Sequence, residues 1–186
     1  MKFEVVTPPE KEPISLDEAK MHLRSIPGDE TEDDAILSPL ITAAREFCEN
    51  RTGRSFGVQT LAAYPPLKTE YFRLPRPPLV QIEQIQVKKA DGTEETLSAD
   101  QYEADTVGGG VFVHWPKEQF AQINPIRILY KTGYQENLPK TIRQAMLLLI
   151  GHWYENRETV VIGAFTSIEI ELTVKALLNQ YKVWWF

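Results

Sequence analysis

The chain has 186 residues, 42% of them hydrophobic, which suits a single folded domain with its own core. Its formal net charge is −6, and this disfavours sequence-general DNA binding because the summed field of the chain repels phosphates. Cys48 is the only cysteine, so the chain can form neither an intrachain disulfide nor a thiolate metal cage, and a reducing compartment is expected.

The N-terminal segment is rich in proline and charge and is expected to resist regular structure as far as Ser15. It lacks the continuous apolar region of a secretory signal, so we expect a cytoplasmic protein. The longest strongly apolar run, Ala145 to Ile150, is far short of the roughly 20 residues that span a bilayer. The sequence therefore predicts no membrane helix.

Two helices are predicted next. Ser15 and Glu18 form a capping-box pattern that predicts a first helix ending near Arg24. From Asp33 to about Arg51, apolar residues recur every three or four positions, which predicts a longer helix with one face in a core. The acidic residues around its start could bind a hard cation, but the helix macrodipole also favours them there, and we prefer that interpretation; they are Asp29, Glu30, Glu32, Asp33 and Asp34.

Residues 56–134 alternate in hydrophobicity over short stretches separated by proline and glycine, which predicts β-strands. The alternation changes phase near Glu83 and Gln84, as a β-bulge would require. Asp91-Gly92 predicts a hairpin turn, and Gly108-Gly109-Gly110 predicts a mobile hairpin tip. The many prolines suggest exposed edges and a small sheet.

Pro139 opens the most apolar helix, in which Leu147 and Leu148 add apolar surface outside the main stripe. This extra surface could be covered by the β region or by a neighbouring subunit. A short stretch at Val160 to Ile162 follows, and a last helix is predicted from Leu172 to Val183.

No arrangement of residues predicts catalysis or a cofactor. His22, His114 and His152 are spread over different elements without a metal-ligand spacing. Cys48 lies on the apolar stripe of its helix and is expected to be a buried, inert thiol.

Two groups of residues are candidates for protein contacts. Leu147, Leu148, Tyr154 and Arg157 lie on or after the apolar helix, whose end suits either a domain edge or a subunit interface. Trp184, Trp185 and Phe186 end the chain, where fraying is usual, so they are expected to be buried against the chain's own bundle or against another protein. Deleting Val183 to Phe186 is expected to leave the fold largely intact and to weaken capture by the partner protein.

Several stretches, taken together and in this order, resemble the head-tail connector (adaptor) proteins of tailed phages. They cover about Pro13 to Tyr181, and they read Cys48-Glu-Asn-Arg-Thr-Gly-Arg-Ser-Phe56, Arg73-Leu-Pro-Arg-Pro-Pro-Leu79, Tyr130-Lys-Thr-Gly-Tyr134, Leu138-Pro-Lys-Thr-Ile-Arg-Gln-Ala145 and His152-Trp-Tyr-Glu-Asn-Arg-Glu158.

The resemblance implies an α+β fold that is mainly α, with a helical bundle core of about four helices and a small antiparallel β insertion. The expected parts of the single domain are a helical core at 15–55 and 138–183, a β insertion at 56–134 and an aromatic tail at 183–186.

The same resemblance implies a structural virion protein, which is not an enzyme and takes no cofactor. Copies would form a ring of about a dozen around a channel through which DNA passes without sequence-specific binding. The ring would bind the portal protein on one side and a stopper or tail-completion protein on the other, at the head-tail interface of the virion after assembly in the host cytoplasm. Trp184, Trp185 and Phe186 are then candidate portal contacts. The alternatives are a tail-completion protein or another minor virion structural protein, and a small hydrolase or transferase.

Overall fold

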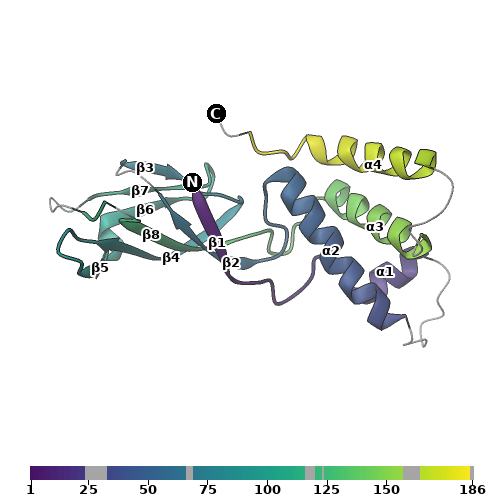
Figure 1. Ribbon diagram of the computed structural model, residues 1–186, viewed down its shortest axis with the longest axis horizontal. Helices are drawn as coiled ribbons and strands as arrows, with labels where there is room; N and C mark the ends of the chain where they lie inside the picture. Colours follow the sequence, from purple (N-terminus) through teal and green to yellow (C-terminus); the bar gives the residue numbers. More distant parts are fainter. Residues whose placement is uncertain (24–32, 66–68, 116–119, 123, 157–163, 185–186) are drawn as a thin grey trace. The chain divides into compact units, whose positions relative to one another are not determined.

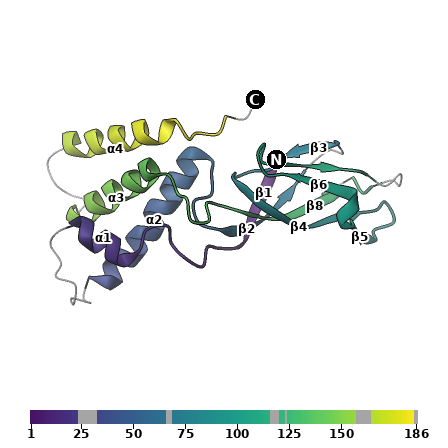
Figure 2. The same cartoon turned by 180° about the vertical axis from the view of Figure 1, so that it is seen from behind.

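The protein was analysed as a computed structural model that describes residues 1–23, 33–65, 69–115, 120–122, 124–156 and 164–184, with the backbone alone for 164–171. The described residues divide into two compact units (Figures 1 and 2). One unit joins Met1–Glu10 to Gly57–Gln135, and the other joins Lys11–Phe56 to Glu136–Phe186.

The first unit contains two antiparallel sheets. The larger has the strand order β1-β2-β8-β4-β5 and the smaller the order β3-β7-β6. The strand bounds are β1 Lys2–Thr7, β2 Gln59–Tyr64, β3 Tyr71–Arg73, β4 Leu79–Lys88, β5 Glu94–Thr96, β6 Tyr102–Asp105, β7 Gly110–Val113 and β8 Ile126–Thr132, with a short 3-10 helix at Ala99–Gln101.

The two sheets share one hydrophobic core, to which β2, β4 and β8 contribute from the larger sheet and β3 and β7 from the smaller. Side chains directly opposite one another on antiparallel strands point to the same face, so Ala63, Ile128 and Ile85 form one buried row across the larger sheet. Tyr130 lies in this core and donates a hydrogen bond from its hydroxyl to the carbonyl oxygen of Pro75 over 2.8 Å.

The second unit contains four helices among the described residues. They are α1 Leu16–Leu23, α2 Asp34–Thr52, α3 Lys140–Glu155 and α4 Ala164–Asn179. Helix α3 packs against both α2 and α4, and α1 packs against α2 and α3 (Figure 1). Helix α2 ends at Gly53, whose φ of 72° is in the left-handed region that glycine tolerates best. None of the helices among the described residues combines the length and hydrophobicity of a transmembrane span.

The expected fold class, mainly α with a helical bundle core, is wrong. The described residues form four helices but also eight strands in two antiparallel sheets, so the fold is α+β and the strands are not a small insertion into a helical bundle. The physical reason is that the strands build a complete core of their own, with Leu61, Ile85, Ile126 and Ile128 fully buried in it.

Single elements agree with the sequence-based predictions more closely. The register of β4 shifts between Ile82 and Gln84, as the change of phase predicted. The turn at Asp91-Gly92 joins β4 to β5, with the amide of Gly92 donating to the carbonyl of Lys89. The segment before Ser15 was expected to be irregular, yet residues 2–7 form β1. The last helix begins at Ala164, earlier than expected, and Val160 to Ile162 lie outside the described residues.

Candidate functional site

The C-terminal segment is fixed to the end of α2 within the helical unit. The Nε atom of Arg54 donates to the carbonyl oxygen of Tyr181 over 2.6 Å. The amide of Val183 donates to the carbonyl oxygen of Thr52 over 2.8 Å. These two bonds satisfy carbonyl groups near the ends of α2 and α4, where the helical pattern leaves such groups unpaired. The chain is therefore held as far as Val183.

Trp184 follows this anchored segment and has 60% of its surface exposed. The Nζ atom of Lys182 lies 4.3 Å from the centroid of its ring, a distance typical of a cation-π contact. Trp185 and Phe186 lie outside the described residues. A large exposed aromatic side chain beside a fixed backbone suits a protein contact, because little backbone freedom is lost when it docks.

The candidate contact residues of α3 have different surroundings. Leu147 is buried within the chain, and Leu148 and Tyr154 are half-buried. The hydroxyl of Tyr154 donates to Oδ2 of Asp33 over 2.8 Å, which ties the end of α3 to the start of α2. Arg157 lies outside the described residues, as do Asp29, Glu30 and Glu32 of the acidic group. Of that group, Asp34 pairs with Lys20 of α1.

A buried ionic network that the sequence did not reveal links Glu12 to α2. The guanidinium of Arg45 donates from Nε to Oε2 of Glu12 over 2.8 Å and from Nη1 to Oε2 of Glu49 over 3.0 Å. Oε1 of Glu49 also accepts a 2.6 Å hydrogen bond from the amide of Phe56. The Arg45–Glu49 spacing of four residues on the apolar stripe of α2 was the available signal.

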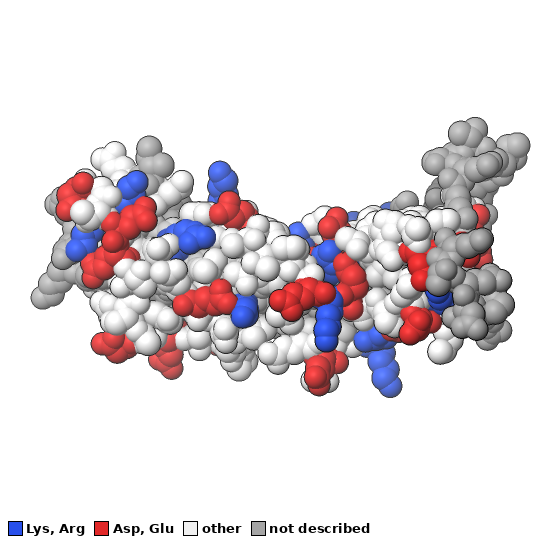
Figure 3. Space-filling view, turned by 90° about the horizontal axis from the view of Figure 1, so that it is seen from below, with Lys and Arg blue, Asp and Glu red and all other residues white. Residues whose placement is uncertain are grey.

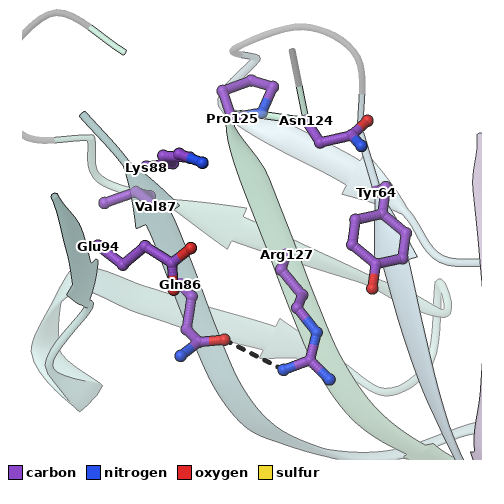
Figure 4. Close-up of a pocket in the computed structure, with 8 residues that line it drawn as sticks. All are labelled: Tyr64, Gln86, Val87, Lys88, Glu94, Asn124, Pro125 and Arg127. Carbon is purple, nitrogen blue, oxygen red and sulfur yellow. Dashed lines mark hydrogen bonds between the residues drawn. The ribbon is translucent and has the colours of Figure 1, made fainter. Parts of the chain in front are cut away.

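The larger sheet carries a polar hollow of about 330 Å³ on the face opposite the core (Figure 4). Nη1 of Arg127, on β8, donates to Oε1 of Gln86, on β4, over 3.1 Å. The hydroxyl of Tyr64, on β2, donates to Oε1 of Glu4 over 2.5 Å, and this hydrogen bond, with burial, raises the pKa of Tyr64. Lys88 and Glu94 place opposite charges at the rim, so the hollow has no single sign of charge.

The predicted hairpin tip between β6 and β7 is organised by Asp105. Its Oδ1 atom accepts from the amide of Gly108 over 2.7 Å, and its Oδ2 atom accepts from the hydroxyl of Tyr71 over 3.0 Å. These bonds stabilise the carboxylate, so they lower the pKa of Asp105. Val107 stands at the tip with 99% of its surface exposed.

No catalytic or metal-binding group emerges from the described residues. Among them, no cluster of three or more histidine, cysteine, aspartate or glutamate side chains could hold a metal ion. Cys48 is fully buried, and its burial, followed by the charge of Glu49, raises the pKa of the thiol to about 12. A thiol with such a pKa stays protonated at neutral pH and is a poor nucleophile.

The face of the molecule in Figure 3 shows acidic and basic side chains interspersed, without a broad basic area. Such a face does not provide the continuous positive surface that phosphate-backbone binding requires.

The chain matches a known protein family. The family model described as "Head completion protein" (HCP) matches residues 14–183, which is nearly the whole chain. None of the curated proteins matches it.

Three solved structures of gene transfer agent (GTA) particles contain similar chains. A chain in the neck of an empty GTA particle, computed with C6 symmetry, is 22% identical with a TM-score of 0.75. A chain in the neck of a native GTA particle, computed with C12 symmetry, is 18% identical with a TM-score of 0.73, and one from the virion of a native GTA particle is 19% identical with a TM-score of 0.70. Each alignment covers 100% of the present chain and 97% of the other. At these identities the likeness shows a shared fold.

Proposed function

The chain belongs to the head completion protein family and is thus a structural protein of the virion head-tail region, and from this premise we propose that its copies form a ring joining the portal to the stopper or tail. DNA passes through the centre of this ring without sequence-specific contacts. The observation that carries the proposal is the family match over residues 14–183.

Two further observations support a ring. The chains with the same fold come from particle necks computed with C6 and C12 symmetry, and cyclic symmetry of that order is compatible with about a dozen identical subunits in one closed ring. The net charge of −6 also suits a channel component, since it weakens adhesion of the chain to passing DNA.

The portal contact in this proposal is the C-terminal segment. Trp184 is exposed and the backbone before it is fixed by Thr52 and Arg54, so the aromatic end can dock without a large loss of backbone entropy. Trp185 and Phe186 follow Trp184 in sequence and are included in the proposed contact. Large aromatic residues often contribute most of the binding free energy at such contacts.

Contact between neighbouring subunits is proposed for the outer surface of α3. Leu148 and Tyr154 are half-buried in the isolated chain, so a neighbour can bury them further, whereas Leu147 already lies within the chain's own core. Arg157 follows α3 in sequence and is included in the proposed contact.

The test is capture of the chain by purified portal protein, with size exclusion and light scattering to measure the assembly. A variant that ends at Val183 keeps its hydrogen bond to Thr52 and should retain the melting temperature of the full chain, while portal capture weakens at least about tenfold, as expected for loss of an aromatic hot spot. The matched control is Met21→Ala, which removes another exposed apolar side chain of the helical unit and should leave capture unchanged.

The outcomes separate the possibilities. If the shortened chain unfolds, the aromatic residues belong to the chain's own core. If the full chain stays monomeric and ignores the portal, the ring-forming adaptor proposal is wrong, and the alternative of a tail-completion or other minor virion protein takes its place.

A further inference from the structure

Strand β1 leaves one edge of the larger sheet open. All six of its residues, Lys2–Thr7, are exposed, and among the described residues only β2 pairs with it. A strand paired on one side leaves every second residue with an unpaired N–H and C=O pointing outward, which is a template for another strand. Proteins commonly protect such edges, so an exposed edge that carries Phe3, Val5 and Val6 calls for a physical explanation.

The side chains of β1 continue the core beyond the last covered strand. Phe3 lies opposite Ala63 and Val5 lies opposite Leu61, so both point to the core face of the sheet. Ala63 and Leu61 are fully buried, whereas Phe3 is 36% and Val5 is 53% exposed. The apolar rows that cross the sheet therefore end only partly covered at β1, where the guanidinium carbon of Arg76 lies 5.6 Å from the centroid of the Phe3 ring.

The other edge of the same sheet has matching chemistry. The strand β5 is followed by Leu97, whose amide donates to the carbonyl of Ile85, so the edge extends over Glu94 to Leu97. Since Thr96 lies opposite Gln86 on the outer face, Glu94 shares that face, and Leu97 lies on the core face, where it is 4% exposed. On β1, Lys2 lies on the outer face, opposite Tyr64.

The directions of the two edges are also compatible with a ring. Each neighbouring pair in the order β1-β2-β8-β4-β5 is antiparallel, so β1 and β5 run in the same direction. Neighbours in a ring of about a dozen copies are related by a rotation of only about 30°, so the β5 edge of one copy placed beside β1 of the next lies nearly parallel to it. A contact between two different edges is heterologous, and it closes into a ring when the rotation closes.

We propose that β1 of each subunit pairs with the Glu94–Leu97 edge of its neighbour, so that the larger sheets of adjacent subunits are joined edge to edge. The match favours a second copy of this chain as the occupant. With Lys2 beside Glu94 on the outer face, a parallel register places Phe3 beside Glu95 and Val5 beside Leu97 on the core face. This inference rests on the proposed ring.

One such contact is short, and it buries far less than the roughly 1,200 Å² of a stable interface. Isolated copies are therefore expected to stay apart until closure of the ring, or binding to the portal, brings many contacts together.

The test is cross-linking in the assembled ring with a bismaleimide that spans about 8 Å, slightly more than two residues of a strand. Lys2→Cys and Glu94→Cys replace exposed side chains, and Cys48 can stay because it is buried. Within one chain the two positions are four strand spacings apart, about 19 Å, so a cross-link between them must join two subunits.

A mixture of the two single variants should give a heterodimer band, and the double variant should give a ladder of oligomers. Neither single variant alone should form a dimer. Lys2→Cys mixed with Val107→Cys is the matched control, because Val107 is exposed on the same unit and lies away from both edges. A dimer of Lys2→Cys alone would show that β1 meets a second β1 and would overturn the proposal.

A second variant tests the contact without a reagent. Val5→Lys places a charge on the exposed apolar edge and should reduce ring assembly at least about tenfold, as lysine at an edge opposes strand addition, whereas Val107→Lys should have no effect.

Light scattering on the same samples separates this inference from the proposed function. Rings that form without the cross-link and despite Val5→Lys would overturn the edge pairing and leave the ring intact. If portal protein yields no ring from the unmodified chain, both proposals fall.

Discussion

Loss of the buried guanidinium of Arg45 should destabilise the helical unit strongly. Arg45 is 6% exposed and Glu49 is 4% exposed, so Arg45→Met leaves the Glu49 carboxylate buried without its cation. Removing one partner of a buried pair costs about 3–5 kcal/mol. Glu49 keeps its hydrogen bond from Phe56, so we expect the low end, about 3 kcal/mol. For a chain of this size that corresponds to a melting temperature about 6–12 °C lower.

The assay is urea unfolding followed by tryptophan fluorescence. Glu46→Gln is the matched control, since Glu46 is exposed and its carboxylate lies 3.6 Å from Arg45, so the expected loss is below about 1 kcal/mol. Arg45→Met combined with Glu49→Gln removes both buried charges and should recover much of the loss. An Arg45→Met variant that is no more destabilised than Glu46→Gln would show that the buried pair does not stabilise the helical unit.

Two further predictions concern stability. Burial raises the pKa of Cys48 from 9.0 to about 12, so above about pH 9 the thiol ionises in the unfolded state but stays protonated in the folded state. The free energy of unfolding is therefore unaffected below about pH 9 and falls by about 1.4 kcal/mol per pH unit above it. Urea titrations of Cys48→Ala between pH 9 and 11 should show a smaller slope. At Gly133, φ is 127° and an added Cβ would lie 2.2 Å from the carbonyl oxygen of Gly57, so Gly133→Ala should lower the free energy of unfolding by about 3 kcal/mol or more. The matched control is Gly92→Ala, where the space is open and the expected loss is about 1 kcal/mol. Equal melting temperatures for the two variants would contradict this prediction.

The helices were largely predictable from the sequence because their apolar stripes repeat at the helical period. Helix α2 was expected from Asp33 to about Arg51 and spans Asp34–Thr52. Strands with one buried face were predictable for a similar reason, because their apolar residues alternate. In β7, for example, Val111 and Val113 are buried and Phe112 between them is exposed. The periodicity of apolar residues thus identifies a helix or strand when one of its faces is exposed to solvent.

The share of strands in the fold was not predictable from the sequence, because several strands lack an alternating pattern of apolar and polar residues. Strand β2 is flanked by β1 and β8, and its residues Gln59–Ala63 are all buried, so hydrophobicity does not alternate along it. Strand β1 stands before a run of prolines that suggested irregular chain. The many prolines predict a small sheet, but Pro75 and Pro125 flank strands instead of interrupting them.

The resemblance to head-tail connectors is confirmed by the family match, and it supplied what residue chemistry alone could not, since no catalytic or ligand-binding pattern marks a structural protein. The candidate contact residues stay predictions. The placement of Trp184 could not be deduced from the sequence, because it depends on two hydrogen bonds between positions more than a hundred residues apart. These bonds join Tyr181 to Arg54 and Val183 to Thr52.

The end of α2 connects these features physically. Within four residues, Glu49 accepts the amide of Phe56 and Thr52 accepts the amide of Val183, while Arg54 binds the carbonyl of Tyr181 just beyond. The buried charge of Arg45 holds Glu49 in place, so the same network that stabilises the helical unit also fixes the backbone from which Trp184 projects. A partner that binds Trp184 would therefore meet a side chain that projects from a fixed backbone, which lowers the ordering cost of docking.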